Sequence, residues 1–396
     1  MPEAFIVAAA RTAGGRRNGR LSGWHPADLA AQVLDALIER TGADPALVDD
    51  VIMGCVGQVG EQAMNVARGA VLASTLPESV PATSIDRQCG SSQQALHFAA
   101  QAVMSGTMDV VIAAGVESMS RVPMGTPSTL PLKNGLGFYV SPLMQRRYPG
   151  IEFSQFTGAE MMAKKYGLDK AALDAYALAS HRLAADATRA GRFAREIVPV
   201  AARMNDRTNA GSEPGDMHAT DEGIRFDATL EGIAAVKLIA EGGCVSAATA
   251  SQICDGASGV MVVNERGLKA LGVAPLARIH HMSVLGHDPV IMLEAPLPAT
   301  QRALKRAGMT IGDIDLYEVN EAFAPVPLAW LQALDADPAR LNVNGGAIAL
   351  GHPLGGSGTK LMTTLVHALH QRGKRYGLQT MCEGGGMANV TIVERL

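Results

Sequence analysis

Four short segments of the chain place reactive side chains beside glycines. The first contains Cys89, which stands just before or at the first turn of a helix expected to run to Ser105. A thiol in that place faces free backbone N–H groups and the positive end of the helix dipole, and both favour a nucleophilic thiolate. A small buried cysteine without a reactive role is an equally weighted alternative.

The second and third segments bring an amide and an imidazole. Asn320 follows an expected strand, at the kind of edge where α/β sheets place ligand groups, although an Asn there also suits the cap of the next helix. His352 is the titratable group in the glycine-rich run 344–358. This run is not a phosphate-binding loop of the G-x-x-x-x-G-K-[ST] type, because Thr359 separates Gly358 from Lys360.

The fourth segment, Met381–Gly386, ends a strand with Cys382 and continues with three glycines whose N–H groups suit an oxyanion hole. A strand-end cysteine is either an acid/base group or an inert side chain. Taken together, Cys89, Asn320, His352 and Cys382 supply a nucleophile, an amide, a base and a second proton carrier. That combination is a complete set for acyl transfer.

Two similar α/β halves are expected to position these groups. Helical periodicity alternates with short β-branched runs, which is typical of a layered α/β protein. The stretch 36–42 resembles 303–308, and each is followed by an aspartate and a strand (Asp50, Asp315), with an offset of 308 − 42 = 266. Gly90-Ser91 and Gly356-Ser357 repeat that offset, which predicts an internal duplication; a chance match is the alternative.

Residues 119–250 interrupt the repeated pattern. Their start is rich in Pro and Gly, helices are expected over 158–165 and 169–190, and 199–232 is irregular and polar. Long loops in a globular protein are usually functional or disordered, so we expect an inserted loop domain that covers a site between the halves. The predicted division is 1–118 with about 251–274 returning to it, 119–250, and 275–396.

The amino-acid composition limits the classes of protein and of binding partner that fit this chain. The 396 residues predict two or three domains, and 47% hydrophobic residues with a net charge of −4 indicate a globular protein with no basic footprint for a nucleic acid. Five cysteines without a C-x-x-C pair predict neither a disulfide framework nor a metal site and favour a reducing compartment. No apolar run is long enough to span a membrane, and Phe5–Ala10 is expected to be a strand, not part of a signal peptide. The arginines at 11, 16, 17 and 20 are expected to lie in a solvated loop, the alternative being a site for an anionic tail.

The chain resembles the thiolases over essentially its whole length. The spans Asn320–Ala324, Gly345–Gly358 and Cys382–Gly386, with the segment around Cys89, look like that family's four signature blocks in the right order. Related condensing enzymes lack the Asn-Glu-Ala-Phe block and the second reactive cysteine. The resemblance implies a five-layered αβαβα fold from two duplicated halves, a loop domain that binds coenzyme A, and a cytoplasmic homodimer or homotetramer. It implies CoA and acyl-CoA as substrates and no metal or permanently bound cofactor.

The resemblance also implies residue roles. Cys89 matches the nucleophile that carries the acyl group, His352 the base that activates it, and Cys382 the acid/base acting on the α-carbon. Asn320, through a water, and His352 match a first oxyanion hole for an enolate. The backbone N–H groups of Cys89 and Gly384 match a second one.

The implied reaction is reversible CoA-dependent cleavage of a 3-ketoacyl-CoA to acetyl-CoA or propionyl-CoA and a shortened acyl-CoA, through acyl-Cys89. A non-catalytic acyl-CoA-binding homologue and another condensing enzyme of the same fold are the alternatives. In the CoA loop, Ser251 is the expected pantetheine contact, flanked by Ala250 and by Gln252, which stands where Gly is common. Ser154-Gln155-Phe156 replaces a common His-Met-Gly, which suggests a changed acyl pocket and resembles enzymes of bacterial lipid and steroid-ring breakdown. The acyl group, the physiological direction, the subunit count and the roles of Cys55 and Cys244 stay open.

Overall fold

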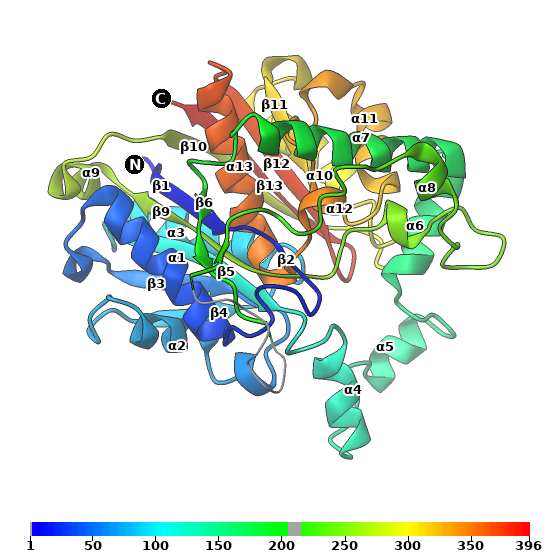
Figure 1. The fold of residues 1–396 in the computed structure, drawn as a ribbon, viewed down its shortest axis with the longest axis horizontal. Coiled ribbons are helices and arrows are strands. Elements are labelled where there is room, and N and C mark those ends of the chain that lie inside the picture. The colour runs from blue at the N-terminus through cyan, green and yellow to red at the C-terminus, as the bar shows by residue number, and fades with distance from the viewer. Residues whose placement is uncertain (1, 205–214) are drawn as a thin grey trace.

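A long mixed sheet runs through the molecule in the order β11-β12-β13-β10-β1-β9-β5-β3-β4. The computed structural model describes residues 2–204 and 215–396, and Figure 1 shows their arrangement. The strands of this path are β1 (Phe5–Thr12), β3 (Asp50–Gly54), β4 (Ala82–Ile85), β5 (Val110–Ser118), β9 (Cys254–Val263), β10 (Ala277–Gly286), β11 (Leu316–Val319), β12 (Tyr376–Glu383) and β13 (Met387–Arg395). Two-residue strands are β2 (Gly15–Arg16), β6 (Ile197–Val198), β7 (Val200–Ala201) and β8 (Met217–His218).

The two halves of this sheet repeat one topology. In the first, β3 is parallel to β5, and β9 is antiparallel to both β5 and β1. In the second, β11 is parallel to β12, and β13 is antiparallel to both β12 and β10. The halves join where β1 pairs antiparallel with β10, with Phe5 opposite Arg278.

Helices complete the layers. One outer layer holds α1 (Pro26–Thr41) and α2 (Val66–Ala73), the other holds α10 (Pro296–Ala307) and α11 (Pro325–Leu334), and α9 (Glu265–Leu271) follows β9. Between the halves lie α3 (Ser91–Ser105) and α13 (Ser357–Gln371), whose apolar faces share one buried cluster with strands of both halves. Gly358 permits their close approach, because a β-carbon there would lie 2.7 Å from the Gln93 α-carbon. The expected five layers are therefore confirmed.

The predicted duplication is visible in hydrogen bonds as well as in element bounds. The helices α3 and α13 begin and end at positions that the repeat makes equivalent, and both Gly42 and Gly308 end outer helices in the left-handed conformation. Asp49 accepts hydrogen bonds from the N–H groups of Asp109 and Val110, and Asp315 accepts the same pair from Arg375 and Tyr376. The sequence comparison paired Asp50 with Asp315, which is wrong by one position, because Asp50 already begins β3.

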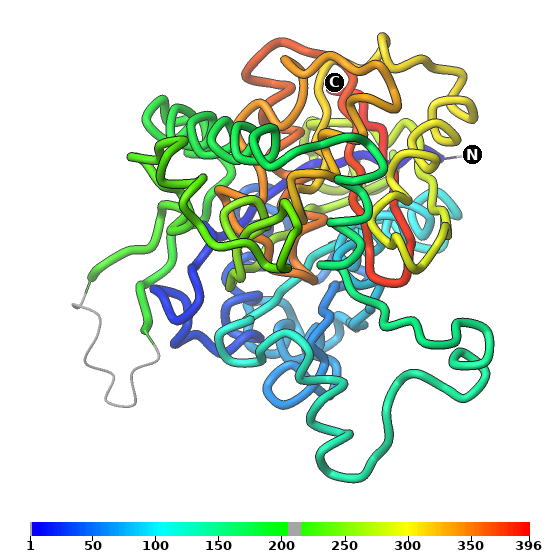
Figure 2. The backbone as a smooth tube through the Cα atoms, turned by 90° about the vertical axis from the view of Figure 1, so that its right-hand side faces the viewer, coloured from blue at the N-terminus to red at the C-terminus, as the bar shows by residue number. Residues whose placement is uncertain are grey.

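The insert contains more helix than its proline content suggested. Besides α6 (Gln155–Lys165) and α7 (Lys170–Arg189), it forms α4 (Thr126–Lys133), α5 (Pro142–Arg147) and α8 (Leu230–Ala234). A short helix of the C-terminal half, α12 (Ala347–Leu350), packs against α7. Pro127 and Pro142 lie in the first turns of α4 and α5, where the missing N–H costs nothing. Figures 1 and 2 both show α4 and α5 on an arm that projects away from the layers. The helices α6 and α7 instead share a buried cluster with the C-terminal half.

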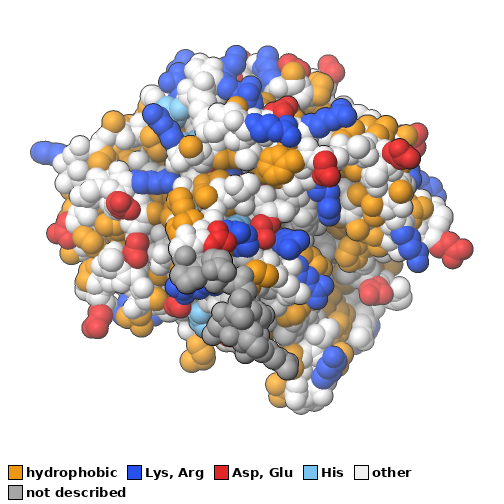
Figure 3. All heavy atoms as spheres, viewed as in Figure 1, with side chains coloured by type: hydrophobic (Ala, Val, Ile, Leu, Met, Phe, Trp, Pro, Cys, Tyr) orange, Lys and Arg blue, Asp and Glu red, His pale blue; other side chains and the backbone are white. Residues whose placement is uncertain are grey.

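The surface carries both signs of charge. On the face in Figure 3, basic and acidic side chains are interspersed, and apolar patches lie among them. None of the described helices combines the length and the apolar character that a membrane crossing requires.

Candidate active site

Cys89 lies in a tight turn at the start of the central helix α3. Its neighbour Gln88 has a left-handed backbone with φ of 49°, an unusual conformation for a non-glycine residue, and Gly90 caps the helix. The turn is held by Ser91, whose hydroxyl accepts a hydrogen bond from the Arg87 N–H and donates one to the Gln88 carbonyl. The predicted position of Cys89 at the helix start is confirmed.

The electrostatics of Cys89 differ from the expectation. Burial of the thiol, and next the nearby Glu383 carboxyl, raise the pKa of Cys89 to about 12. The sequence-based expectation of a standing thiolate is therefore wrong, and the resting group is a neutral thiol.

The end of β12 brings Cys382 to the same turn. Cys382 is buried at 1% exposure, and its pKa is raised by burial and by its proximity to Cys89. Its neighbour Glu383 packs against Gly90, where an added β-carbon would lie 2.6 Å from the Glu383 Cδ. Gly384 lies against the Gln88 side chain. The Cys89 and Cys382 segments, one from each half, are therefore in direct contact.

His352 and Asn320 form the second pair. Asn320 directly follows β11, and its Nδ2 lies 3.4 Å from His352 Nε2, while His352 Nδ1 lies 2.5 Å from Ser357 Oγ. The Ser357 hydroxyl donates its single hydrogen to the Pro353 carbonyl, 2.8 Å away. Its oxygen therefore accepts a hydrogen bond from His352 Nδ1–H. Nε2 then carries the lone pair. Burial lowers the pKa of His352 to about 3, so the resting imidazole is neutral and its Nε2 can accept a hydrogen bond.

Asn320 does not cap the following helix, whose cap residue is Ala324. The strand-end position predicted for the amide is confirmed, and the capping alternative is wrong. The backbone of His352 is fixed by its N–H, which donates to the Gln252 carbonyl at 3.0 Å.

Glu117, at the end of β5, holds the segment Val56–Gly57 close to the loop that follows His352. Its carboxylate accepts hydrogen bonds from the N–H groups of Val56, Gly57 and Gly355 and from the Gln62 amide. Glu117 therefore ties the end of β5 to the glycine-rich loop that follows His352.

The predicted CoA loop lies beside the Asn320 segment. The Ser251 N–H donates to the Ala322 carbonyl at 2.9 Å, and Ala250 forms an antiparallel bridge with Phe323. The Gln252 amide donates to the carbonyls of Gly223 and Ile348, at 2.7 and 2.8 Å. The side chain of Gln252 thus ties a segment of the insert to the loop that carries His352.

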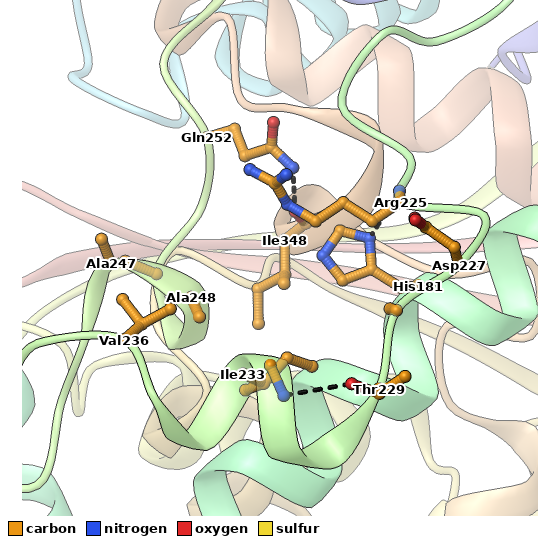
Figure 4. Close-up of a pocket in the computed structure, with 13 residues that line it drawn as sticks. His181, Arg225, Asp227, Thr229, Ile233, Val236, Ala247, Ala248, Gln252 and Ile348 are labelled. Atoms are coloured by element: carbon orange, nitrogen blue, oxygen red, sulfur yellow. Dashed lines mark hydrogen bonds between the residues drawn. The ribbon is translucent and has the colours of Figure 1, made fainter.

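Two adjoining cavities meet at this loop. One of about 690 Å³ is lined by His352, Phe323 and the predicted residues Ala250, Ser251 and Gln252. Its neighbour, about 410 Å³, shares five lining residues with it: Arg225, Asp227, Ala247, Ala250 and Gln252. Figure 4 shows Val236, Ala247 and Ala248 opposite His181 and Arg225 in this second cavity. Cys89, Cys382 and Asn320 are not among the residues that line either one.

The walls of these cavities also include arginines and an aromatic ring, among which only Arg225 was not singled out from the sequence. Arg225 lines both cavities, and Arg16 and Arg17 line the larger one, so three guanidinium groups stand beside it. Phe156 also lines it and packs edge-on against Phe323, with ring centroids 5.6 Å apart. The neighbouring basic residues at 16 and 17 were a visible signal, whereas nothing in the local pattern of the insert distinguished Arg225.

Arg11 does not belong to that basic group. It is fully buried in β1, where it pairs with Asp221 and Glu196, so the expectation of a solvated loop is wrong for this residue. In an otherwise apolar strand, Arg11 thus forms buried ion pairs with two carboxylates of the insert.

The remaining cysteines are free thiols. Cys55 lies near Glu117, Cys254 packs against Gly351, and Cys244 contacts Glu160 at 3.4 Å. Among residues 2–204 and 215–396, no group of three or more His, Cys, Asp or Glu side chains has the geometry to hold a metal ion.

The Cys89 thiol and the His352 imidazole are both uncharged at rest, so they form no standing ion pair. The N–H groups of Gly90 and Ser91 donate to the carbonyls of Arg87 and Gln88, at 3.1 and 3.0 Å, and close the turn that presents Cys89.

Comparison with known proteins gives consistent matches along the chain. A family model described as "Thiolase, N-terminal domain" matches residues 4–266, and one described as "Thiolase, C-terminal domain" matches 273–395. The chain is 50% identical to the steroid 3-ketoacyl-CoA thiolase FadA6 of Mycobacterium tuberculosis over 401 residues, which cover 100% of this chain and 95% of that protein. It is 41% identical to a 3-ketoacyl-CoA thiolase of Yersinia pestis and 40% identical to one of Aeromonas salmonicida, each covering 100% of both chains.

Proposed function

The chain belongs to the thiolase family, and from this premise we propose that it cleaves 3-ketoacyl-CoA with CoA through an acyl group on Cys89. The observation that carries the proposal is the contact of the Cys89 turn with the Cys382 turn. His352 and Asn320 lie together beside a cavity whose size fits a cofactor-sized ligand.

In the first half of the reaction, His352 Nε2 takes the proton of Cys89 as the sulfur attacks the 3-keto carbon. The N–H groups of Cys89 and Gly384 hold the oxyanion. The bond between the α- and β-carbons then breaks, and its electron pair leaves as the enolate of acetyl-CoA. Cys382 protonates the α-carbon of that enolate, whose oxygen is held by His352 and, through a water, by Asn320.

In the second half, CoA replaces acetyl-CoA and its thiol loses a proton to the Cys382 thiolate. The CoA sulfur attacks acyl-Cys89 and releases the shortened acyl-CoA. The Cys89 thiolate recovers its proton from His352, so every group returns to its starting state. The raised pKa values of both thiols keep them protonated at rest, so Cys89 loses its proton only during attack and Cys382 only when it protonates the enolate.

CoA is proposed to lie along the two cavities. Ser251, with Ala250 and Gln252, would contact pantetheine, and Arg225 with Arg16 and Arg17 would face the phosphates. Phe156 and Phe323 would border the acyl group.

The domain plan follows the same proposal. Residues 1–118, with 251–274, form the N-terminal half, because β9 returns to pair with β1 and β5. Residues 119–250 form the loop domain and 275–396 the second half. We also propose a cytoplasmic homodimer or homotetramer; the free cysteines and the exposed Leu136 and Leu143 on the arm support it.

The direct test is mass spectrometry after incubation with acetyl-CoA. Cys89 is expected to gain the mass of one acetyl group, and Cys89→Ala is expected to lose both this label and thiolysis. A CoA-binding homologue without turnover would bind acetyl-CoA and leave Cys89 unlabelled. Thiolysis measured on short, long, branched and cyclic 3-ketoacyl-CoAs then identifies the acyl group, and failure with all of them would favour another condensing reaction.

A further inference from the structure

A small cavity adjoins Asn320 and shares no lining residue with the two larger ones. Its volume is about 10 Å³, and Glu318, Asn320, Ser357 and Lys360 are polar side chains in its wall. A cavity of roughly 10–15 Å³ is the smallest that holds one water molecule, and such a water needs two to four polar partners.

Two buried oxygens at this cavity have no protein partner. Glu318 Oε2 and Asn320 Oδ1 accept no hydrogen bond from any described residue, and each residue is only 1% exposed. Buried polar atoms are normally hydrogen-bonded to protein or to ordered water. Two unpaired acceptors at a cavity of this size point to a water between them.

Lys360 supplies the donor. Its ammonium donates to the carbonyls of Leu350 and Gly351, at 2.5 and 3.1 Å, which are the two residues before His352. Asp221 Oδ1 lies 3.8 Å from Nζ, beyond a normal hydrogen bond. An ammonium has three N–H donors and no acceptor, so a water beside it accepts from Nζ and directs its own hydrogens to other oxygens.

We propose that one water in this cavity joins Lys360, Glu318 and Asn320, and that Glu318 and Lys360 are positioning residues that set the orientation of the Asn320 amide. The water accepts from Lys360 Nζ and donates to Asn320 Oδ1 and Glu318 Oε2. With Oδ1 engaged, Asn320 presents Nδ2 toward His352. A flipped amide would present an oxygen there and remove the donor that the enolate needs.

This inference rests on the proposed function, because it assumes that Asn320 acts on the enolate oxygen. It predicts an effect on one step of the reaction. Carbon–carbon cleavage uses the Asn320 donor, whereas acetylation of Cys89 by acetyl-CoA uses the backbone N–H groups of Cys89 and Gly384. A variant that merely loosens the fold would slow both.

The test compares Glu318→Leu, Glu318→Gln and Lys360→Met with wild type. The probes are acetoacetyl-CoA plus CoA for cleavage and acetyl-CoA alone for the rate of Cys89 acetylation, followed by mass. Glu318→Leu is expected to lower kcat for cleavage by about tenfold or more while acetylation stays within about twofold. Lys360→Met also removes the donors to Leu350 and Gly351, so it is expected to slow both reactions, and cleavage at least about tenfold more than acetylation. Glu318→Gln is expected to recover most of the cleavage rate, because its amide oxygen still accepts from the water.

Thr300→Val is the matched control, a buried polar-to-apolar change in α10 away from the site. A high-resolution crystal structure of the wild type is expected to show the water. Three outcomes would each overturn the inference. The variants could slow both reactions equally, Glu318→Leu and Lys360→Met could cleave at the wild-type rate, or Glu318→Gln could be as slow as Glu318→Leu. If Glu318→Leu does not fold, the same split in Lys360→Met decides. A wild-type chain that neither acetylates Cys89 nor cleaves any 3-ketoacyl-CoA overturns the proposed function instead.

Discussion

The carboxyl group of Glu383 lies directly against the α-carbon of Gly90. A β-carbon at Gly90 would overlap Glu383 Oε1 and lie 2.7 Å from Asn389 Oδ1. The contact joins the end of β12 to the turn that presents Cys89, so the spacing of the two thiols depends on a residue without a side chain.

Gly90→Ala is therefore expected to push the two turns apart. Overpacking of this kind costs about 1–3 kcal/mol, and we expect a loss of that size in the free energy of unfolding, with kcat/KM reduced more than about tenfold. Urea unfolding and thiolysis assays measure both. Gly69→Ala in α2 is the matched control, since its β-carbon would meet Ala27 at an ordinary 3.4 Å. Wild-type activity in Gly90→Ala would show that the contact does not set the thiol geometry.

Asn320→Ala is expected to lower kcat for thiolysis by about 10²–10³, the usual effect of losing one oxyanion donor. Acetylation of Cys89 by acetyl-CoA is expected to persist, because the backbone N–H groups remain. Equal losses in both reactions would assign Asn320 a structural role.

The raised pKa of Cys89 predicts its reactivity toward iodoacetamide. Because the thiolate fraction grows with pH below the pKa, the alkylation rate is expected to rise about tenfold per unit between about pH 6 and about pH 9. Peptide mass mapping follows Cys89 alone, and Cys89→Ala serves as the blank. A plateau near neutral pH would reveal a standing thiolate and contradict the environment described here.

Phe156 is expected to restrict the acyl group. Phe156→Ala removes the ring that packs against Phe323 and widens the larger cavity. The ratio of kcat/KM for cyclic over short 3-ketoacyl-CoAs is expected to change by about tenfold, the usual scale of apolar pocket discrimination. Leu72→Ala on the exposed face of α2 controls for general effects. An unchanged ratio would place the acyl group elsewhere.

His97 is expected to make the fold sensitive to acid. Burial, together with the charge of Arg87, lowers the pKa of His97 to about 3, and its Nε2 lies 2.8 Å from Thr391 Oγ1. Since the folded pKa lies below the unfolded one, this stabilisation is complete above about pH 6.5 and is lost as the pH falls. The loss is roughly 2 kcal/mol at about pH 5.

Urea unfolding of His97→Gln at neutral and acid pH tests this sensitivity. The glutamine keeps a polar partner for Thr391 but does not titrate, so the difference in unfolding free energy between the two conditions is expected to shrink. A variant with the wild-type pH dependence would show that other groups bind the protons.

The elements that position the reactive groups were predictable from the sequence. The offset between Gly90-Ser91 and Gly356-Ser357 identified both central helices, and the strand-end positions of Asn320 and Cys382 followed from local patterns. Such features depend on neighbours along the chain, where periodicity and glycine positions are direct signals.

Features that depend on distant segments were not predictable in this way. The expected thiolate at Cys89 failed because the burial and the Glu383 carboxyl that raise its pKa come from contacts made by the other half. Arg11 looked like one of several loop arginines until Asp221 and Glu196, which are remote in the sequence, were placed beside it. Arg225 lies in the cavity wall because of how the insert folds, and the sequence has no repeat or motif at that position that would predict it.

The internal repeat makes Glu117 the counterpart of Glu383, and Gly355 the counterpart of Cys89. Glu117 is saturated with hydrogen bonds, one of them from Gly355, while both carboxyl oxygens of Glu383 lack a partner among the described residues. Each of these two contacts therefore combines one segment from each half: Glu117 of the first half meets Gly355 of the second, and Glu383 of the second meets Gly90 of the first. Neither half alone contains a complete contact of either kind, so the Cys89 turn takes its observed surroundings only when the two halves pack together.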